Sequence, residues 1–161
     1  MGAHPGARVQ GPRRVIAVDT NLLVYAHRED SEWHAQALAC LDEVAGRPAP
    51  WAIPWPCVHE FYAIVTHPRI YDPPTPLSIA IDQIACWMEA PNLVLLAETP
   101  GYWERLRTLM EPARTTGPQV HDARVAALCL HHGVRTLWTA DRDFGRFPEL
   151  MVRNPLLPVH G

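Results

Sequence analysis

The sequence predicts an α/β protein with a parallel sheet that helices cover on both faces. Short apolar runs of strand length alternate with longer segments in which apolar residues recur at helical spacing. This alternation continues from end to end, without an internal repeat or a long linker. Strands separated by helices indicate a parallel sheet, and 161 residues are a usual length for one domain.

The expected elements follow from this pattern in chain order. Residues 1–13 lack periodicity and are expected to form a disordered tail, so that a single folded domain spans residues 14–161. Apolar runs predict five strands: Val15–Asp19, Trp51–Ile53, Leu93–Leu96, Arg135–Trp138 and, at an edge of the sheet, Leu150–Val152. Helical spacing and prolines that suit a first turn predict five helices: Ser31–Ala45, Pro56–Thr66, Leu77–Glu89, Tyr102–Met110 and Pro118–His132, the last closed by Gly133.

Composition limits the possible chemistry. All fourteen basic residues are arginines, which excludes a Walker-A lysine, a Schiff base and a lysine general base, although genome composition alone can produce this bias. No apolar run has the ~20 residues that cross a bilayer, and the N-terminal apolar segment is too short for a secretory signal, so a cytoplasmic location is expected. The cysteines form no CxxC pair and are expected to be free thiols in the core: Cys40, Cys57, Cys86 and Cys129.

Acidic residues follow two of the predicted strands and lie near the start of two predicted helices. Asp19 ends the first strand, and Asp141 follows the fourth, with Asp143 two residues later. In a parallel sheet, ligands bind at the edge where the carboxyl ends of the strands meet, and the helices that carry Glu60 and Asp122 begin at that same edge. The sequence therefore predicts a cluster of carboxylates. A net charge of −3 is unusual for a nucleic-acid binder unless metal ions neutralise such a cluster.

Each acid also has a purely structural interpretation. Asp19 and Asp141 could cap the turns that follow them, and Asp122 could support the dipole of its helix. Glu60 stands in a mostly apolar helix, so its structural alternative is a buried arginine partner. Crowded carboxylates repel one another, however, and divalent cations relieve that repulsion. Oxygen ligands favour Mg²⁺ or Mn²⁺, and such ions can activate water and stabilise the leaving oxygen of a phosphodiester.

Four short segments, in this order, resemble the PIN-domain nucleases. They are V-D-T-N at Val18–Asn21, H-E-F at His59–Phe61 with the following T-H-P, D-A-R-V-A-A-L at Asp122–Leu128 and T-A-D-R-D-F at Thr139–Phe144. Their order and spacing suit that family across about residues 15–158. The stretch from Pro54 to Tyr71 and the ending R-F-P-E-L…N-P-L more narrowly resemble the VapC-type toxins of bacterial toxin–antitoxin pairs.

The resemblance implies a three-layer α/β/α sandwich with a parallel sheet of four or five strands. It implies Mg²⁺- or Mn²⁺-dependent endoribonuclease activity on RNA, homodimers and a VapB-type antitoxin partner. It assigns catalytic roles to Asp19, Glu60, Asp122 and Asp141, and metal ligation to Asp19, Asp122 and Asp141. Asp143 matches a further acid of many members, and Thr139 matches a hydroxyl residue that would orient a carboxylate or a bound water.

Hydrolysis at such a site would leave a 3′-hydroxyl and a 5′-phosphate, with Glu60 binding a second ion or positioning the attacking water. His121 departs from the family pattern and could contact RNA, assist proton transfer or simply face solvent. Trp51 and Trp55 flank a proline-bounded strand and could line a groove for the antitoxin or pack in the core. Arginines near the motifs are the candidate phosphate ligands: Arg28, Arg124, Arg142 and Arg146.

Two other functions fit part of the pattern. A haloacid-dehalogenase-type phosphatase also has an aspartate after its first strand, but it needs a second aspartate where this chain has Asn21, and usually a lysine. A non-catalytic RNA-binding or scaffold domain could keep the same fold, and loss of an acid would indicate it. All four acids are present, so the predicted function is that of a toxin endoribonuclease.

Overall fold

A computed structural model describes residues 14–158, and the tail expected over residues 1–13 lies outside that range. Five parallel strands form one sheet within it, in the order β3-β2-β1-β4-β5. The strands are β1 (Ile16–Val18), β2 (Trp51–Pro54), β3 (Leu93–Leu96), β4 (Thr136–Trp138) and β5 (Met151–Arg153). Each lies where an apolar run predicts it, and the parallel α/β fold is confirmed.

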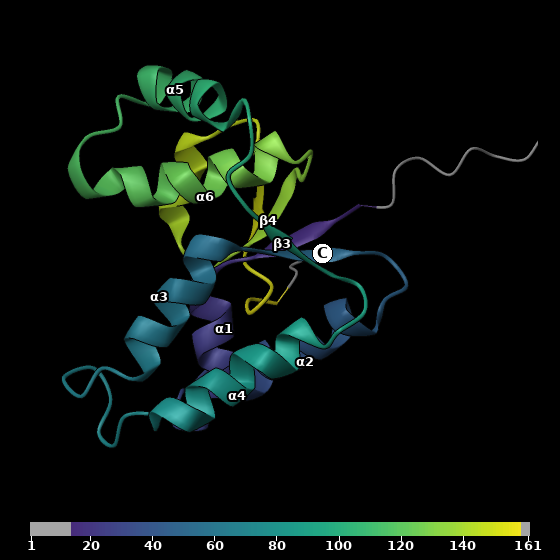
Figure 1. Ribbon diagram of the computed structural model, residues 1–161, viewed down its shortest axis with the longest axis vertical. Helices are drawn as coiled ribbons and strands as arrows, with labels where there is room; N and C mark the ends of the chain where they lie inside the picture. Colours follow the sequence, from purple (N-terminus) through teal and green to yellow (C-terminus); the bar gives the residue numbers. More distant parts are fainter. Residues whose placement is uncertain (1–13, 159–161) are drawn as a thin grey trace, which may run out of the picture.

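Helices cover both faces of this sheet (Figure 1). One side carries α5 (Tyr102–Ala113) and α6 (Val120–His131). The other side carries α1 (Thr20–His27), α2 (His34–Gly46), α3 (Trp55–Val65) and α4 (Leu77–Met88). Two short 3₁₀ helices complete the described range: η1 (Gly117–Gln119) and η2 (Arg142–Arg146). The arrangement is the expected three-layer sandwich.

The sequence pattern does not predict α1. This helix follows β1 after a single residue, and five of its eight residues are buried: Thr20, Leu22, Leu23, Val24 and Ala26. A helix that is buried around most of its circumference has no polar face, so its sequence lacks the amphipathic spacing by which the other helices are found. Its absence from the prediction matters because the N-terminus of α1 begins directly after Asp19.

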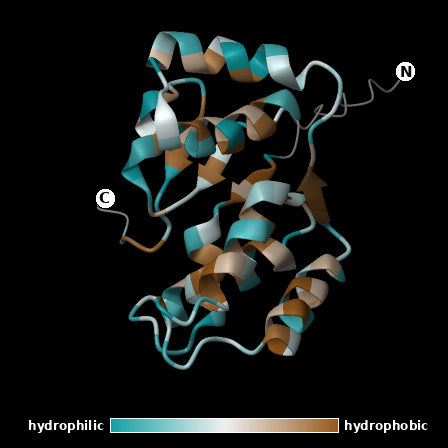
Figure 2. Cartoon of the chain, turned by 60° about the vertical axis from the view of Figure 1, so that its left-hand side comes forward, coloured by the Kyte–Doolittle hydropathy of each residue, from teal (hydrophilic) through white to brown (hydrophobic). Residues whose placement is uncertain are grey.

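Apolar residues concentrate in the strands and on the inward faces of the helices (Figure 2). All of β1 is buried, and Trp51 in β2 is only 1% exposed, so the core interpretation of that tryptophan is confirmed. Cysteines 40, 57 and 129 are buried as expected, but Cys86, in α4, is exposed, so the core interpretation is wrong for that residue. No helix among the described residues combines the length and apolar character that spanning a membrane requires.

The strand order reverses direction once. From β1 the sheet extends through β2 to β3 on one side, whereas β4 and β5 add to the other side of β1. The point where the order reverses lies between β1 and β4, and connections that leave in opposite directions open a crevice there. Val18 is in register with Trp138, so Asp19 and Thr139 emerge side by side at the carboxyl edge of the sheet.

Candidate active site

Asp19 lies deepest in the crevice, with 6% of its surface exposed. Its Oδ2 accepts hydrogen bonds from Thr139 Oγ1 at 2.8 Å and Asn21 Nδ2 at 3.5 Å, and its Oδ1 accepts one from Cys57 Sγ at 3.4 Å. Burial raises the pKa of Asp19, although the bonds from Thr139, the Thr20 backbone and Cys57 oppose that rise. The side chain makes no capping bond to α1, so helix capping does not explain why an aspartate stands here.

Thr139 connects the ends of β1 and β4. Its hydroxyl donates to Asp19 and accepts from Asn21 Nδ2 at 3.1 Å and from the backbone N–H of Asp141 at 3.0 Å. One proton and two lone pairs are all that a hydroxyl offers, so Thr139 is fully used. The side-chain oxygen of Asn21 also accepts the backbone N–H of Ala140 at 3.1 Å. This network holds the two strand ends in a fixed relation.

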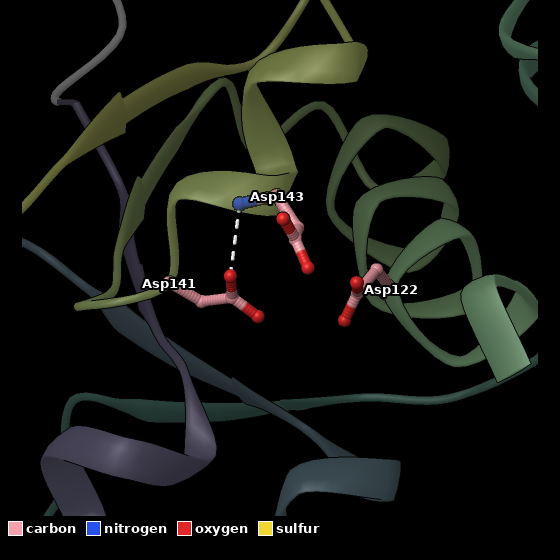
Figure 3. A group of neighbouring side chains, drawn as sticks. All are labelled: Asp122, Asp141 and Asp143. Carbon is pink, nitrogen blue, oxygen red and sulfur yellow. Dashed lines mark hydrogen bonds between the residues drawn. The ribbon is translucent and has the colours of Figure 1, made fainter.

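Three further carboxylates gather at the mouth of the crevice (Figure 3). Asp122, from the first turn of α6, and Asp141 and Asp143, from η2, each present an oxygen within 4.8 Å of the other two. Asp141 also caps η2, because its Oδ1 accepts the backbone N–H of Asp143 at 2.8 Å. The capping interpretation of Asp141 is therefore correct, and its second carboxylate oxygen still faces Asp122 and Asp143 (Figure 3).

Electrostatics joins this group to the buried aspartate. Burial, followed by the charges of Asp141, Asp19 and Asp143, raises the pKa of Asp122 to about 6, and Arg146 opposes the rise. Because the charge of Asp19 contributes, Asp19 lies near enough to Asp122 for the two carboxylates to interact, although it is not one of the three that gather at the mouth. Sequence reasoning counted Asp143 only as a further acid, but the geometry places it within the cluster.

Glu60 approaches the site from α3. Its Oε2 accepts a hydrogen bond from Thr20 Oγ1 at 3.0 Å, and its charge raises the pKa of Asp19. The residue is exposed, and no arginine forms an ion pair with it among residues 14–158. The structural alternative of a buried arginine partner is therefore wrong, because α3 turns this position toward solvent at the edge of the crevice.

The arginines near the motifs have different environments. Arg28 lies at the end of α1 opposite to Asp19, where it binds Asp30 at 2.6 Å, donates to the carbonyl of Pro73 at 3.1 Å and covers the ring of Tyr71 at 4.2 Å. These contacts fix the loop after α3 to α1, so the structure gives Arg28 a structural role in place of the expected phosphate contact.

Of the other three arginines, only Arg146 contacts a carboxylate of the cluster. Arg146 is 3.7 Å from Asp143, and its Nη1 is buried without a hydrogen-bond partner in the described part of the chain. Arg124 is 3.5 Å from Glu98. Arg142 is exposed. His121 is exposed as well, which confirms the interpretation that it faces solvent.

Sequence reasoning missed two groups that contact Asp19. Asn21 was noted only as part of a motif, yet it binds both Asp19 and Thr139. Cys57 was assigned to the core, and its thiol does lie there, but it donates to the buried carboxylate. The position of Asn21 in the first turn of α1 would have been the available signal, had that helix been predicted.

Comparisons with known proteins identify the family of this chain. The sequence profile of the PIN domain matches residues 16–150. Ribonuclease VapC48 of Mycobacterium tuberculosis is 30% identical over 137 residues, which make up 85% of this chain and 94% of that protein. Ribonuclease VapC43 of the same species is 32% identical over 142 residues, or 88% of this chain and 96% of that protein.

Solved structures share the fold at lower identity. Rickettsia felis VapBC2, bound to a DNA fragment from its promoter, superimposes with a TM-score of 0.60 at 18% identity, covering 86% of this chain and 97% of that one. Mycobacterium tuberculosis VapC20, a toxin that cleaves the sarcin-ricin loop, gives a TM-score of 0.60 at 16% identity, with 81% and 92% covered. At these identities the likeness is one of fold.

Proposed function

The chain belongs to the PIN-domain family, and on that premise we propose that it is a metal-dependent endoribonuclease and the toxin of a toxin–antitoxin pair. One observation supports this most strongly: Asp122, Asp141 and Asp143 gather their carboxylates within 4.8 Å of one another, near enough to the buried Asp19 for its charge to raise the pKa of Asp122. Its relatives of 30–32% identity are named ribonucleases, and it spans at least 94% of their length. The presence of every acid argues against a non-catalytic domain.

The carboxylate cluster suits a divalent cation. The oxygens of Asp122, Asp141 and Asp143 lie within 4.8 Å of one another, comparable to the ~4 Å between opposite oxygen ligands around Mg²⁺. A donor set made only of oxygens favours Mg²⁺ or Mn²⁺ over softer metals. Burial and then repulsion among the aspartates raise the pKa of Asp122, and a bound cation would offset both effects. We assign these three residues and Asp19 as the groups that hold the ion. When bound, the ion would lower the pKa of a water molecule and stabilise the leaving oxygen.

The chain's own residues supply orientation and proton transfer in this proposal. Thr139 favours the ionised form of Asp19 by donating to it. Thr20 holds Oε2 of Glu60, which leaves Oε1 without a partner among the described residues and able to accept a proton from the attacking water. Attack of that water on phosphorus breaks the bond to the 3′ oxygen and leaves a 3′-hydroxyl and a 5′-phosphate. Arg142, which is exposed and lies between Asp141 and Asp143 in the chain, is our candidate for contacting the phosphate.

Cleavage of total RNA by the purified full chain, free of any antitoxin, tests the proposal. Discrete fragments with 5′-phosphates are expected with Mg²⁺ or Mn²⁺ and not with EDTA. Asp19→Asn and Glu60→Gln should each reduce the rate by about a hundredfold or more, the usual scale for loss of a general base or of a charged active-site group.

A matched control is Asp82→Asn, which removes an exposed carboxylate from α4 and should leave the rate unchanged. Fragments with 2′,3′-cyclic phosphates would show that water is not the nucleophile. Failure of the folded protein to cut any RNA, with metal still bound, would favour the non-catalytic alternative.

We also propose a homodimer and a VapB-type antitoxin as partners. The solved structure of VapBC2 is that of a VapB–VapC pair. In this chain, α4 exposes four large apolar side chains: Leu77, Ile79, Ile81 and Met88. Apolar residues that gather on one exposed helix commonly mark a protein interface. Light scattering during gel filtration, alone and with candidate VapB-type proteins, should show a dimer and a heteromeric complex. A monomer that binds none of them would contradict both assignments.

A further inference from the structure

A cavity of about 210 Å³ lies between the start of α3, the end of β3 and α6. Its walls come from the start of α3 (Trp55 and Pro56), the end of β3 (Leu96) and the side of α6 that carries Arg124 and Leu128. Arg124 follows Asp122 by two residues, which is ~3 Å along the helix axis, and an α-helix is ~10 Å across. The cavity therefore opens on the same edge of the sheet as the acids, about one helix diameter from them.

The lining suits a flat ring. Leu96 is 2% exposed and Leu128 is fully buried, so the floor is apolar and already packed. Trp55 is half-buried, and His59 packs against its ring with centroids 5.9 Å apart at 31°. The volume is below the ~300–1,000 Å³ typical of pockets for drug-sized ligands. A single nucleobase is of suitable size, and stacking on an aromatic side chain is how proteins hold unpaired bases.

Polar groups stand at the rim of this apolar cavity. Nε of Arg124 is 3.5 Å from Oε1 of Glu98, longer than the ~2.7–2.9 Å of a tight charged pair, so both groups remain able to bind a ligand. The hydroxyl of Tyr102 is buried without a hydrogen-bond partner in the described structure, and it lies close enough that the charges of Glu98 and Arg124 both influence its pKa. The rim thus offers a carboxylate acceptor beside a guanidinium donor.

We propose that this cavity binds a guanine base of the RNA substrate, next to the phosphate that is cut. The inference rests on the proposed nuclease function and adds a base preference to it. Guanine has two adjacent N–H donors, at N1 and N2, that match the two oxygens of Glu98, and acceptors at O6 and N7 that match the fork of Arg124. Adenine and cytosine each present an amino donor beside an unprotonated ring nitrogen on the corresponding edge, so they offer the carboxylate one donor group in place of two.

Binding of short fluorescent RNAs tests this inference separately from cleavage. The probes are hexauridylates in which one uridine is replaced by guanosine, inosine or adenosine, added to the Asp141→Asn protein so that they are not cut. The guanosine probe should bind about tenfold more tightly than the inosine probe, which lacks only the N2 amino group, and than the adenosine probe. Glu98→Gln should remove the preference for the guanosine probe without lowering the affinity for the adenosine probe.

Variants of Trp55 test the stacking surface. Trp55→Ala should weaken binding of the guanosine probe about tenfold or more, and Trp55→Phe should keep most of the wild-type affinity. Trp103→Ala is the matched control, because that tryptophan is 60% exposed on α5, and it should leave binding unchanged. Thermal unfolding of each variant, compared with the parent protein, identifies loss of folding, and Glu98→Gln changes only an exposed side chain.

The possible outcomes separate the two proposals. If the wild-type chain cuts RNA but its base preference is unchanged in Trp55→Ala and Glu98→Gln, the guanine site is wrong and the nuclease stands. If Trp55→Ala weakens the binding of a VapB-type partner but not the binding of RNA, the cavity is a contact site for that partner, and the inference is again overturned. If the wild-type chain neither binds nor cuts RNA, both proposals fail.

Discussion

Asp122→Asn should make the metal-free protein more stable at neutral pH. Burial and the charges of Asp141, Asp19 and Asp143 raise the pKa of Asp122 from an ordinary 3.8 to about 6, which means that its ionised form opposes folding. A pKa change of this size corresponds to ~3 kcal/mol. Because the side chain is only partly buried, solvent screening should reduce the effect to roughly 1 kcal/mol. For a chain of this length that is ~2–4 °C in Tm.

The pH dependence of this effect has a definite sign. Below pH 3.8 Asp122 is protonated in the folded and unfolded chains alike, and its contribution to stability is fully present. That contribution is lost as the pH rises from 3.8 through about 6, whereas an asparagine never ionises. Wild-type and variant proteins should therefore unfold at similar temperatures near pH 4 and differ by the full amount above pH 7.

Thermal unfolding across this pH range, in EDTA and then with Mn²⁺, is the assay. The wild-type Tm should rise when Mn²⁺ binds, and that of Asp122→Asn should rise less, since a ligand is missing. Asp82→Asn, on the exposed side of α4, is the control for removing one negative charge. A variant less stable than the wild type in EDTA at pH 7, or a difference independent of pH, would refute the argument that burial and neighbouring charges disfavour the ionised form of Asp122.

Two further substitutions test the remaining contacts. Thr139→Val removes a hydrogen bond to the buried carboxylate of Asp19 and leaves the Asp141 N–H without its acceptor. The free energy of unfolding should therefore fall by ~2–4 kcal/mol, and Mn²⁺ binding should be weaker by isothermal titration. A change no larger than that of Thr108→Val, at an exposed hydroxyl, would disprove the bridging role. Arg28→Met should lower the Tm while leaving the rate of RNA cleavage unchanged, because Arg28 lies at the far end of α1 from Asp19; a tenfold loss of RNA affinity would instead restore it as a phosphate ligand.

Helix periodicity in the sequence predicted five of the six α-helices. It missed α1, and it did not predict which side of a helix is exposed. The buried helix α1 has no polar face for the pattern to reveal. Glu60 and Cys86 stand among apolar neighbours in the sequence, yet both are exposed. Which side of a helix faces solvent depends on the elements that pack against it, and the sequence of that helix alone does not contain this information.

By itself, the sequence determined the succession of strands and helices, and it placed acids after β1 and β4 and near the start of α3 and α6. These are local properties, since periodicity and turn residues act over a few positions. Only the tertiary structure decided that β1 pairs with β4, 120 residues away, and this pairing set Thr139 against Asp19 and Asp143 near Asp122. The cavity between α3 and α6 likewise exists only because distant segments pack together, and packing depends on the burial of apolar surface by the whole chain.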